Sequence, residues 1–131
     1  MNLIITGNPG VGKHTIANLL QEKNKSFQVL DISKFAIEKN LGEQVEDGIE
    51  IDTVKLANEI KKLVLEKSLI VGHLAPYVFD ETMVDLVIVL RKNPYDLVDI
   101  YKEREYQDSK IKENAGSEIL GVIANLSLIH I

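Results

Sequence analysis

The strongest constraint on this fold comes from residues 3–15, where an apolar segment leads directly into a glycine-rich turn. Residues 3–5, Leu-Ile-Ile, have the β-branched, apolar character of a buried parallel strand. They are followed by Gly7-x-x-x-x-Gly12-Lys13, and then by apolar residues at helical spacing: Ile16, Ala17, Leu19 and Leu20. A strand, a glycine loop and a helix in this order form the setting of a phosphate-binding P-loop.

Each part of this motif has a reason in the chemistry of anion binding. Glycines allow backbone conformations closed to other residues and bring N–H groups close to a phosphate. The helix after Gly12 adds unpaired N–H groups and the positive end of its dipole, and Lys13 adds a point charge for the terminal phosphates. We therefore predict that the following residues bind the nucleotide: Gly7, Asn8, Gly10, Gly12, Lys13, His14 and Thr15.

One position departs from the usual motif. The residue after the lysine is normally Ser or Thr, whose hydroxyl binds Mg²⁺, but here it is His14, with Thr15 next. Thr15 is therefore the predicted metal ligand, and His14 is interpreted as a tolerated, partly exposed substitution rather than a catalytic base. The alternative to phosphate binding is an ordinary glycine turn, which the flanking strand and helix disfavour.

Composition limits the remaining possibilities. The chain has 131 residues, which suits one domain with a real core, and it contains no cysteine for a disulfide or a thiolate metal site. Its net charge of −5 and pI near 5.2 argue against a broad nucleic-acid footprint, although a local contact with RNA or a basic protein stays open. The first apolar run is too short for a signal peptide or a membrane span, so we expect a soluble, cytoplasmic protein without membrane contact.

Alternating strand and helix patterns predict an α/β fold with a parallel sheet flanked by helices on both faces. Ser33 is the predicted cap of the second helix, and residues 42–50 read as an acidic loop. Residues 86–90 form a continuous apolar run, which predicts a central, buried strand. The predicted strands are 2–6, 27–30, 69–72 and 86–90. Three helices are predicted at 12–23, 34–40 and 109–125. Of the two others, one is capped by Asp52 or Thr53 and has an apolar stripe that ends at Val64, and one begins at Asn93-Pro94.

Several polar residues follow the ends of these predicted strands. Ligands of parallel α/β sheets bind at the carboxyl ends of the strands. The glycine loop, Asp31, His73 and Arg91 each follow such an end, so we expect them to share one rim. Their convergence supports a single active site better than any one residue does.

With these residues in place, the chain resembles the adenylate kinase isoenzyme 6 family over nearly its whole length. The glycine loop alone is shared by many nucleotide-binding proteins, whereas the ordered set of motifs is more specific. That set consists of Gly7-Asn-Pro-Gly-Val-Gly-Lys13, Asp31-Ile-Ser33, Glu50-Ile-Asp52, Ile70-Val-Gly-His73, Val89-Leu-Arg91, Arg104-x-Tyr106 and Glu113-Asn114.

The resemblance implies a single P-loop kinase-type domain over residues 1–131, with a monophosphate-binding region at about 31–51 and a lid at about 103–113. It implies ATP with Mg²⁺ as cofactor, AMP as acceptor, ATPase activity, and a link to small ribosomal subunit maturation through a ribosomal protein. Lys13, His73 and Arg104 are the implied catalytic residues. Arg91 and Arg104 are implied to bind the nucleotide, although Arg91 could instead pair with an acid, and His73 could be a hydrogen-bonded structural histidine.

The chain also departs from the family pattern. Ile37 stands where relatives often have an arginine, and Val71 and Gly72 stand where an acid is expected, so a Walker B carboxylate is missing. Arg91 and Arg104 are the only arginines in the chain. Because phosphoryl transfer depends on positioning and charge neutralisation, so few arginines weaken the kinase interpretation and leave nucleotide binding intact.

Alternatives therefore remain open. One is a nucleotide-gated ribosome assembly factor, for which the acidic residues 43–50 would face a basic ribosomal protein; another is a degenerate copy without kinase activity. Asp31 and Asp52 could hold metal-bound water or the second substrate, and Asp52 could equally be a helix cap. Family members usually continue past the final helix, so we expect a C-terminal truncation, with residues 126–131 as a potential edge strand.

Overall fold

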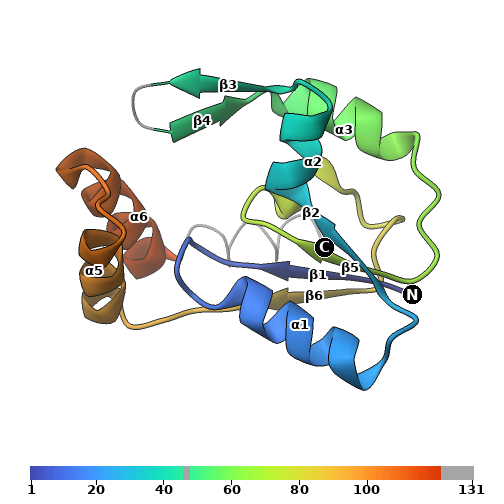
Figure 1. Cartoon of the computed structure of the whole chain (residues 1–131), viewed down its shortest axis with the longest axis horizontal. Helices are drawn as coiled ribbons and strands as arrows, with labels where there is room; N and C mark the ends of the chain where they lie inside the picture. The colour runs from blue at the N-terminus through green and yellow to red at the C-terminus, as the bar shows by residue number, and fades with distance from the viewer. Residues whose placement is uncertain (46–47, 122–131) are drawn as a thin grey trace.

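A four-stranded parallel sheet, in the order β2-β5-β1-β6, organises the computed structural model, which describes residues 1–45 and 48–121 (Figure 1). Parallel pairing places Ile4 opposite Ile70 on one side and opposite Val87 on the other. The predicted α/β fold with a parallel sheet is confirmed. The strands are β1 (Asn2–Thr6), β2 (Gln28–Asp31), β5 (Ser68–Val71) and β6 (Leu86–Val89).

Alternating side chains of the central strands serve the two faces of the sheet. Ile4 is buried in the larger core, whereas its neighbour Ile5 packs with Ala17 of α1 (Lys13–Lys23) on the opposite face. Figure 1 shows α1 on one side of the sheet, with α2 and α3 on the other. The helices that pack on the Ile4 face are α2 (Ile32–Glu38), α3 (Thr53–Lys61) and the short α4 (Ala75–Val78), which is not among the predicted helices.

A pair of helices lies beyond the carboxyl ends of the strands (Figure 1). These helices, α5 (Pro94–Glu103) and α6 (Asp108–Leu120), pack on each other through Leu97, Tyr101 and Ile111. Burial raises the pKa of Tyr101 to about 12, so its hydroxyl stays protonated and donates to the carbonyl of Pro9 at 2.5 Å. The helix pair is thereby attached to the glycine loop.

The predicted acidic loop at residues 42–50 is wrong for the part that the structure describes. Strands β3 (Gly42–Val45) and β4 (Gly48–Ile51) form an antiparallel hairpin that extends away from the main sheet (Figure 1). In its register Glu43 pairs with Glu50. Backbone pairing therefore overrides the high acidic content, while Glu46 and Asp47 lie outside the described residues.

The predicted cap of α2 and the predicted position of β6 in the sheet are both wrong. Ser33 does not cap α2, because the helix begins at Ile32 and the Asp31 side chain accepts from the amide of Lys34. Strand β6 is not central: in the part of the chain that the structure describes it lies at an edge, and Leu86 is 50% exposed. An apolar run cannot distinguish these positions, since helices cover both faces of edge strands as well.

The helix boundaries differ where amphipathic patterns run past the true end. Val64 is exposed, because α3 ends at Lys61 and no longer directs this side chain inward. Ile119 lies within the predicted helix 109–125, on the last turn of α6, and its side chain is exposed. The structure does not describe residues 122–131, which include the end of the predicted last helix and the potential strand 126–131.

Candidate nucleotide-binding site

The glycine loop between β1 and α1 adopts a conformation that other residues could not take. Gly7 and Gly12 have φ values of 149° and 99°, in the range that favours glycine. A Cβ at Gly7 would lie 2.5 Å from the carbonyl oxygen of Leu90 and 2.7 Å from Cγ2 of Val11. The spacing read from the sequence therefore corresponds to a tight loop that ends at an uncapped helix N-terminus.

Lys13 lies inside this loop with only 9% of its surface exposed. Its Nζ donates to the carbonyl oxygens of Gly7 at 2.8 Å and Asn8 at 3.2 Å. Burial and the nearby charge of Arg104 lower the pKa of Lys13 to about 8, although Asp31 acts in the opposite direction. The ammonium is thus held at the loop by neutral carbonyls, in a place where an anionic ligand would stabilise its charge.

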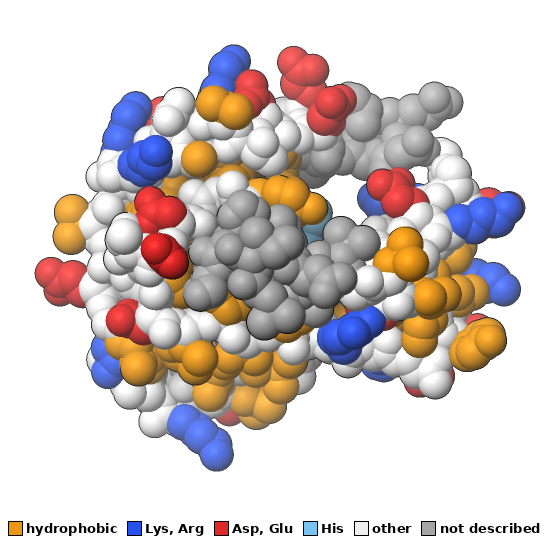
Figure 2. Space-filling model, turned by 180° about the vertical axis from the view of Figure 1, so that it is seen from behind, with side chains coloured by type: hydrophobic (Ala, Val, Ile, Leu, Met, Phe, Trp, Pro, Cys, Tyr) orange, Lys and Arg blue, Asp and Glu red, His pale blue; other side chains and the backbone are white. Residues whose placement is uncertain are grey.

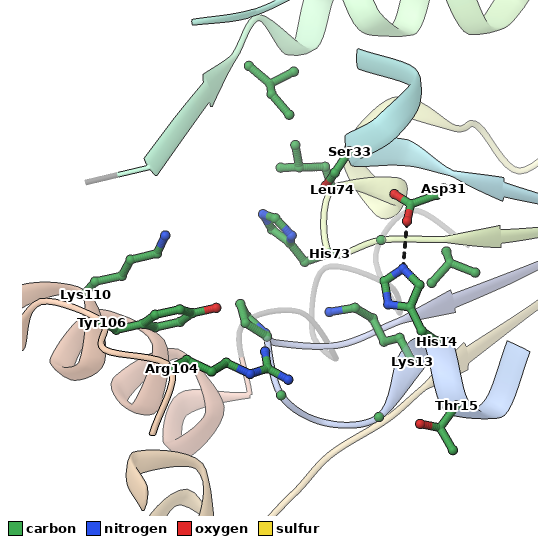
Figure 3. A pocket seen from close by; sticks show the side chains of 16 residues that line it. Lys13, His14, Thr15, Asp31, Ser33, His73, Leu74, Arg104, Tyr106 and Lys110 are labelled. Atoms are coloured by element: carbon green, nitrogen blue, oxygen red, sulfur yellow. Dashed lines mark hydrogen bonds and ion pairs between the residues drawn. The ribbon is translucent and has the colours of Figure 1, made fainter. Parts of the chain in front are cut away.

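A pocket of about 570 Å³ opens in front of the loop, and we call it the central pocket. In Figure 3 the side chains of Lys13, His73, Arg104 and Lys110 extend toward the same space from different elements. The pocket is lined by Pro9, Gly10, Gly12, Lys13, His14, Thr15, Asp31, Ser33, Ile51, Val71, Gly72, His73, Leu74, Arg104, Tyr106 and Lys110.

Most of the predicted site residues meet in the central pocket. The structure brings together the loop, His14, Asp31, His73 and Arg104, which are far apart in the sequence. Gly7 and Asn8 do not line the pocket, since Gly7 lies behind the loop and is buried. Among the polar lining residues, three carried no prediction as site residues: Ser33, Lys110 and Tyr106, the last of which was noted only as a family landmark.

His73 and Arg104 give the pocket two groups of different character. Burial, together with the positive charges of Lys13 and Lys110, lowers the pKa of His73 to about 4, so its imidazole is neutral near pH 7. Arg104 follows the last turn of α5, and within residues 1–45 and 48–121 its guanidinium has no hydrogen bond or ion pair. A cation without a carboxylate partner at the rim of a pocket can bind an anion without first breaking an ion pair.

His14 and Asp31 form a hydrogen-bonded pair on one wall of the central pocket. His14 Nε2 and Asp31 Oδ2 are 2.7 Å apart, although the His14 side chain is 64% exposed. Burial opposes ionisation of Asp31, but hydrogen bonds from His14 and from the Lys34 amide, with both nearby charges, outweigh it and lower the pKa of the carboxyl. The residue interpreted as a tolerated substitution therefore has a defined partner, which the sequence did not indicate.

A second group of charges lies on the other side of the loop, and we call it the Glu118 cluster. Glu118 of α6 is 3% exposed and accepts from Asn8 Nδ2 at 2.7 Å, Arg91 Nε at 2.9 Å and the Lys92 amide at 3.3 Å. Arg91 also donates through Nη2 to the Glu118 carbonyl oxygen. Arg91 therefore pairs with an acid and does not line the central pocket. Nothing in the sequence singled out Glu118 among the acidic residues of the helix.

Few groups in the central pocket could hold a metal ion by themselves. Asp52 lies elsewhere and caps α3, since its Oδ1 accepts from the amides of Val54 and Lys55 at 3.1 Å. Across the described residues there is no group of three His, Cys, Asp or Glu side chains that could bind a metal. Asp31 and Thr15 are among the lining residues, so a divalent cation brought in by phosphates would find one or two protein ligands there, as Mg²⁺ often does.

Charges on the outer surface are dispersed. On the face shown in Figure 2, lysine and arginine side chains alternate with acidic ones, and no continuous positive patch is formed by the described residues. None of the described helices combines the length and the apolar character needed to cross a membrane. In the central pocket, by contrast, three cationic residues line one space: Lys13, Arg104 and Lys110.

The sequence matches one family model, described as an AAA domain, over residues 3–121. It is 37% identical to a protein named "Putative adenylate kinase" from Pyrococcus abyssi over 94% of this chain and 66% of that protein, and 38% identical to one of the same name from Thermococcus kodakarensis over 94% and 67%. It is 36% identical to "Adenylate kinase isoenzyme 6 homolog FAP7" from Saccharomyces cerevisiae over 93% of this chain and 64% of that protein. The chain thus spans about two thirds of the length of these relatives.

Proposed function

Because this chain belongs to the AAA-domain family and, within it, to the adenylate kinase isoenzyme 6 group, we propose that its central pocket binds ATP and that the protein transfers the γ-phosphoryl group to AMP. The observation that carries the proposal is the buried Lys13 ammonium at the mouth of a glycine loop, directed into a pocket of about 570 Å³. Amides of the loop and of the α1 N-terminus would cradle the phosphates.

The charges in the central pocket suit the electrostatics of phosphoryl transfer. Lys13 would bridge the β- and γ-phosphates, and Arg104 would neutralise charge that develops on the transferred group. His73, being neutral, would position the acceptor or a water molecule through a hydrogen bond rather than through charge. Mg²⁺ bound with ATP would supply further charge neutralisation, and Thr15 is the residue that the sequence predicts to hold it.

The acceptor would occupy the part of the central pocket that α2 and β4 line. Ser33 of α2 and Ile51 of β4 line it there, within the proposed monophosphate-binding region at 31–51. Residues 103–113, between α5 and the first half of α6, contribute Arg104, Tyr106 and Lys110 and would act as the lid. The whole of residues 1–131 would then belong to one P-loop kinase-type domain.

A specific observation favours a second function. Arg91 is bound to Glu118, so Arg104 is the one arginine of the chain that lines the central pocket. Val71 and Gly72 also line it without supplying an acid. Such a site could bind and hydrolyse ATP slowly and use the bound nucleotide to control assembly with a small-subunit ribosomal protein.

Following ADP and free phosphate separately distinguishes these functions. The protein is incubated with ATP and Mg²⁺, with and without AMP. We expect ADP to form only with AMP and without equivalent free phosphate. Free phosphate at the same rate with and without AMP would favour the nucleotide-gated assembly factor, and neither product despite bound ATP would identify a degenerate copy.

A further inference from the structure

His14, the residue after the P-loop lysine, is held in a fixed orientation although its side chain is 64% exposed. His14 replaces the hydroxyl residue expected at the cation-binding position, yet its imidazole is held by Asp31 at 2.7 Å instead of pointing freely into solvent. Both residues line the central pocket beside Lys13. In Figure 3 the dashed contact runs from one ring nitrogen of His14 to the Asp31 carboxylate.

Asp31 is itself fixed in place. Its Oδ1 accepts from the amide of Lys34, because Asp31 is the N-cap of α2, while its Oδ2 faces His14 Nε2. A carboxylate accepts hydrogen bonds only, so Nε2 carries the proton. The other ring nitrogen, Nδ1, then has a free lone pair in the neutral imidazole. In the view of Figure 3 this nitrogen lies on the side of the ring nearer to Lys13.

A histidine that donates one N–H to a carboxylate and offers the other nitrogen is the usual arrangement of a metal ligand with its orienting partner. We propose that Nδ1 of His14 binds the divalent cation of the metal–nucleotide complex, with Asp31 as the residue that positions the ring. This inference rests on the proposed ATP site. An imidazole nitrogen binds first-row transition ions more strongly than a hydroxyl oxygen does, so His14 raises the affinity for Co²⁺, and to a smaller extent for Mn²⁺, relative to Mg²⁺.

Thr15 is the rival ligand, since the sequence predicted it and it also lines the pocket. The two assignments differ in the donor atom. A hydroxyl oxygen at Thr15 gives the ordinary Mg²⁺ preference, whereas an imidazole nitrogen at His14 changes both the preference and the spectroscopic signature of the ion.

The test uses Mn²⁺ with a non-hydrolysable ATP analogue and pulsed EPR on protein labelled with ¹⁵N-histidine. The chain has three histidines, so His14→Thr and His73→Gln are compared under the same labelling. We expect a ¹⁵N coupling from a directly bound imidazole in the wild type and in His73→Gln, and none in His14→Thr. Thr15→Val retains the coupling if His14 is the ligand.

Affinity measurements complete the test. For His14→Thr we expect Mn²⁺–analogue affinity to fall about tenfold or more and the preference to revert to Mg²⁺. Asp31→Asn retains a capping oxygen but removes the charge, and we expect it to lower Mn²⁺–analogue affinity about tenfold while Mg²⁺–analogue affinity changes less. Analogue binding without histidine coupling, and with the same Mg²⁺ preference in wild type and His14→Thr, overturns this inference alone. If the analogue does not bind with Mg²⁺, with Mn²⁺ or with Co²⁺, the proposed function is overturned as well.

Discussion

The central pocket and the Glu118 cluster lie on two sides of the same glycine loop and use their charges in opposite ways. In the Glu118 cluster a buried carboxylate accepts from Asn8, Arg91 and the Lys92 amide, so the arginine is bound within the protein. In the central pocket Arg104 has no hydrogen bond or ion pair within the described part of the chain, and Lys13 is held by carbonyls. Glu118 of α6 therefore makes Arg91 a structural arginine, whereas Arg104 has no such acid beside it in the described part of the chain and is available to a ligand.

The largest effect is expected for Arg104→Ala. Removing a charge that faces the transferred phosphoryl group should lower the turnover of ATP with AMP by about 10²–10³-fold, with little change in the melting temperature. Initial rates of ADP formation measure this effect. An unchanged rate would mean that Arg104 is only a solvated helix end.

Arg91→Ala should have the converse effect. It leaves Glu118, which is 3% exposed, without its charged partner, and we expect the free energy of unfolding to fall by about 2 kcal/mol. Urea denaturation measures the loss, and Glu118→Gln is the matched variant from the other side of the pair. If the turnover of ATP with AMP fell in Arg91→Ala as much as in Arg104→Ala, Arg91 would contact the nucleotide, as the family resemblance implies.

The sequence predicted the parts of the site that depend on local spacing. The strand, loop and helix of residues 3–15 lie where the motif placed them, because the glycines and Lys13 are constrained within one turn. The convergence of Asp31 and His73 with the loop also followed, since parallel strands bring their carboxyl ends to one edge.

Contacts between distant segments could not be predicted in this way. Glu118 meets Arg91 across 27 residues, and one acid among many on a helix carries no signal of its partner. The order of strands in a sheet cannot be read from an apolar run either, so β6 was expected at the centre although it lies at an edge of the sheet that residues 1–45 and 48–121 form. The hairpin was missed because the acidic content of residues 42–50 was given more weight than Ile49 and Ile51, which alternate with polar residues as in a strand.

The neutral histidine of the central pocket gives a smaller, pH-dependent effect. His73 has a pKa of about 4 in the folded state and about 6.5 when unfolded, so the unfolded state binds more protons between these values. Stability should therefore decrease as the pH falls from about 6.5 to 4, by of order 2 kcal/mol, and His73→Gln should remove that part. Melting temperatures of both proteins across this range test it; equal slopes would place His73 in solvent.

The smallest expected effect is the change in protonation of Lys13 when ATP binds. With a pKa of about 8 in the free protein, it is about half protonated at pH 8, and bound phosphates should raise that pKa. ATP binding at pH 8 should then take up about half a proton, whereas binding at pH 6.5 should take up almost none from this group. Calorimetry in buffers of different ionisation enthalpy measures the uptake. Equal uptake at both pH values would contradict the lowered pKa.

The most direct test of the account is calorimetric titration of ATP into the wild type, Lys13→Ala and Lys25→Ala. Lys25 is exposed and lies outside the central pocket, so it is the matched control for loss of one lysine. We predict that ATP affinity falls by about 10²-fold or more in Lys13→Ala and is unchanged in Lys25→Ala, with both variants folded. Unchanged ATP binding in folded Lys13→Ala would contradict the assignment of the glycine loop as the phosphate site.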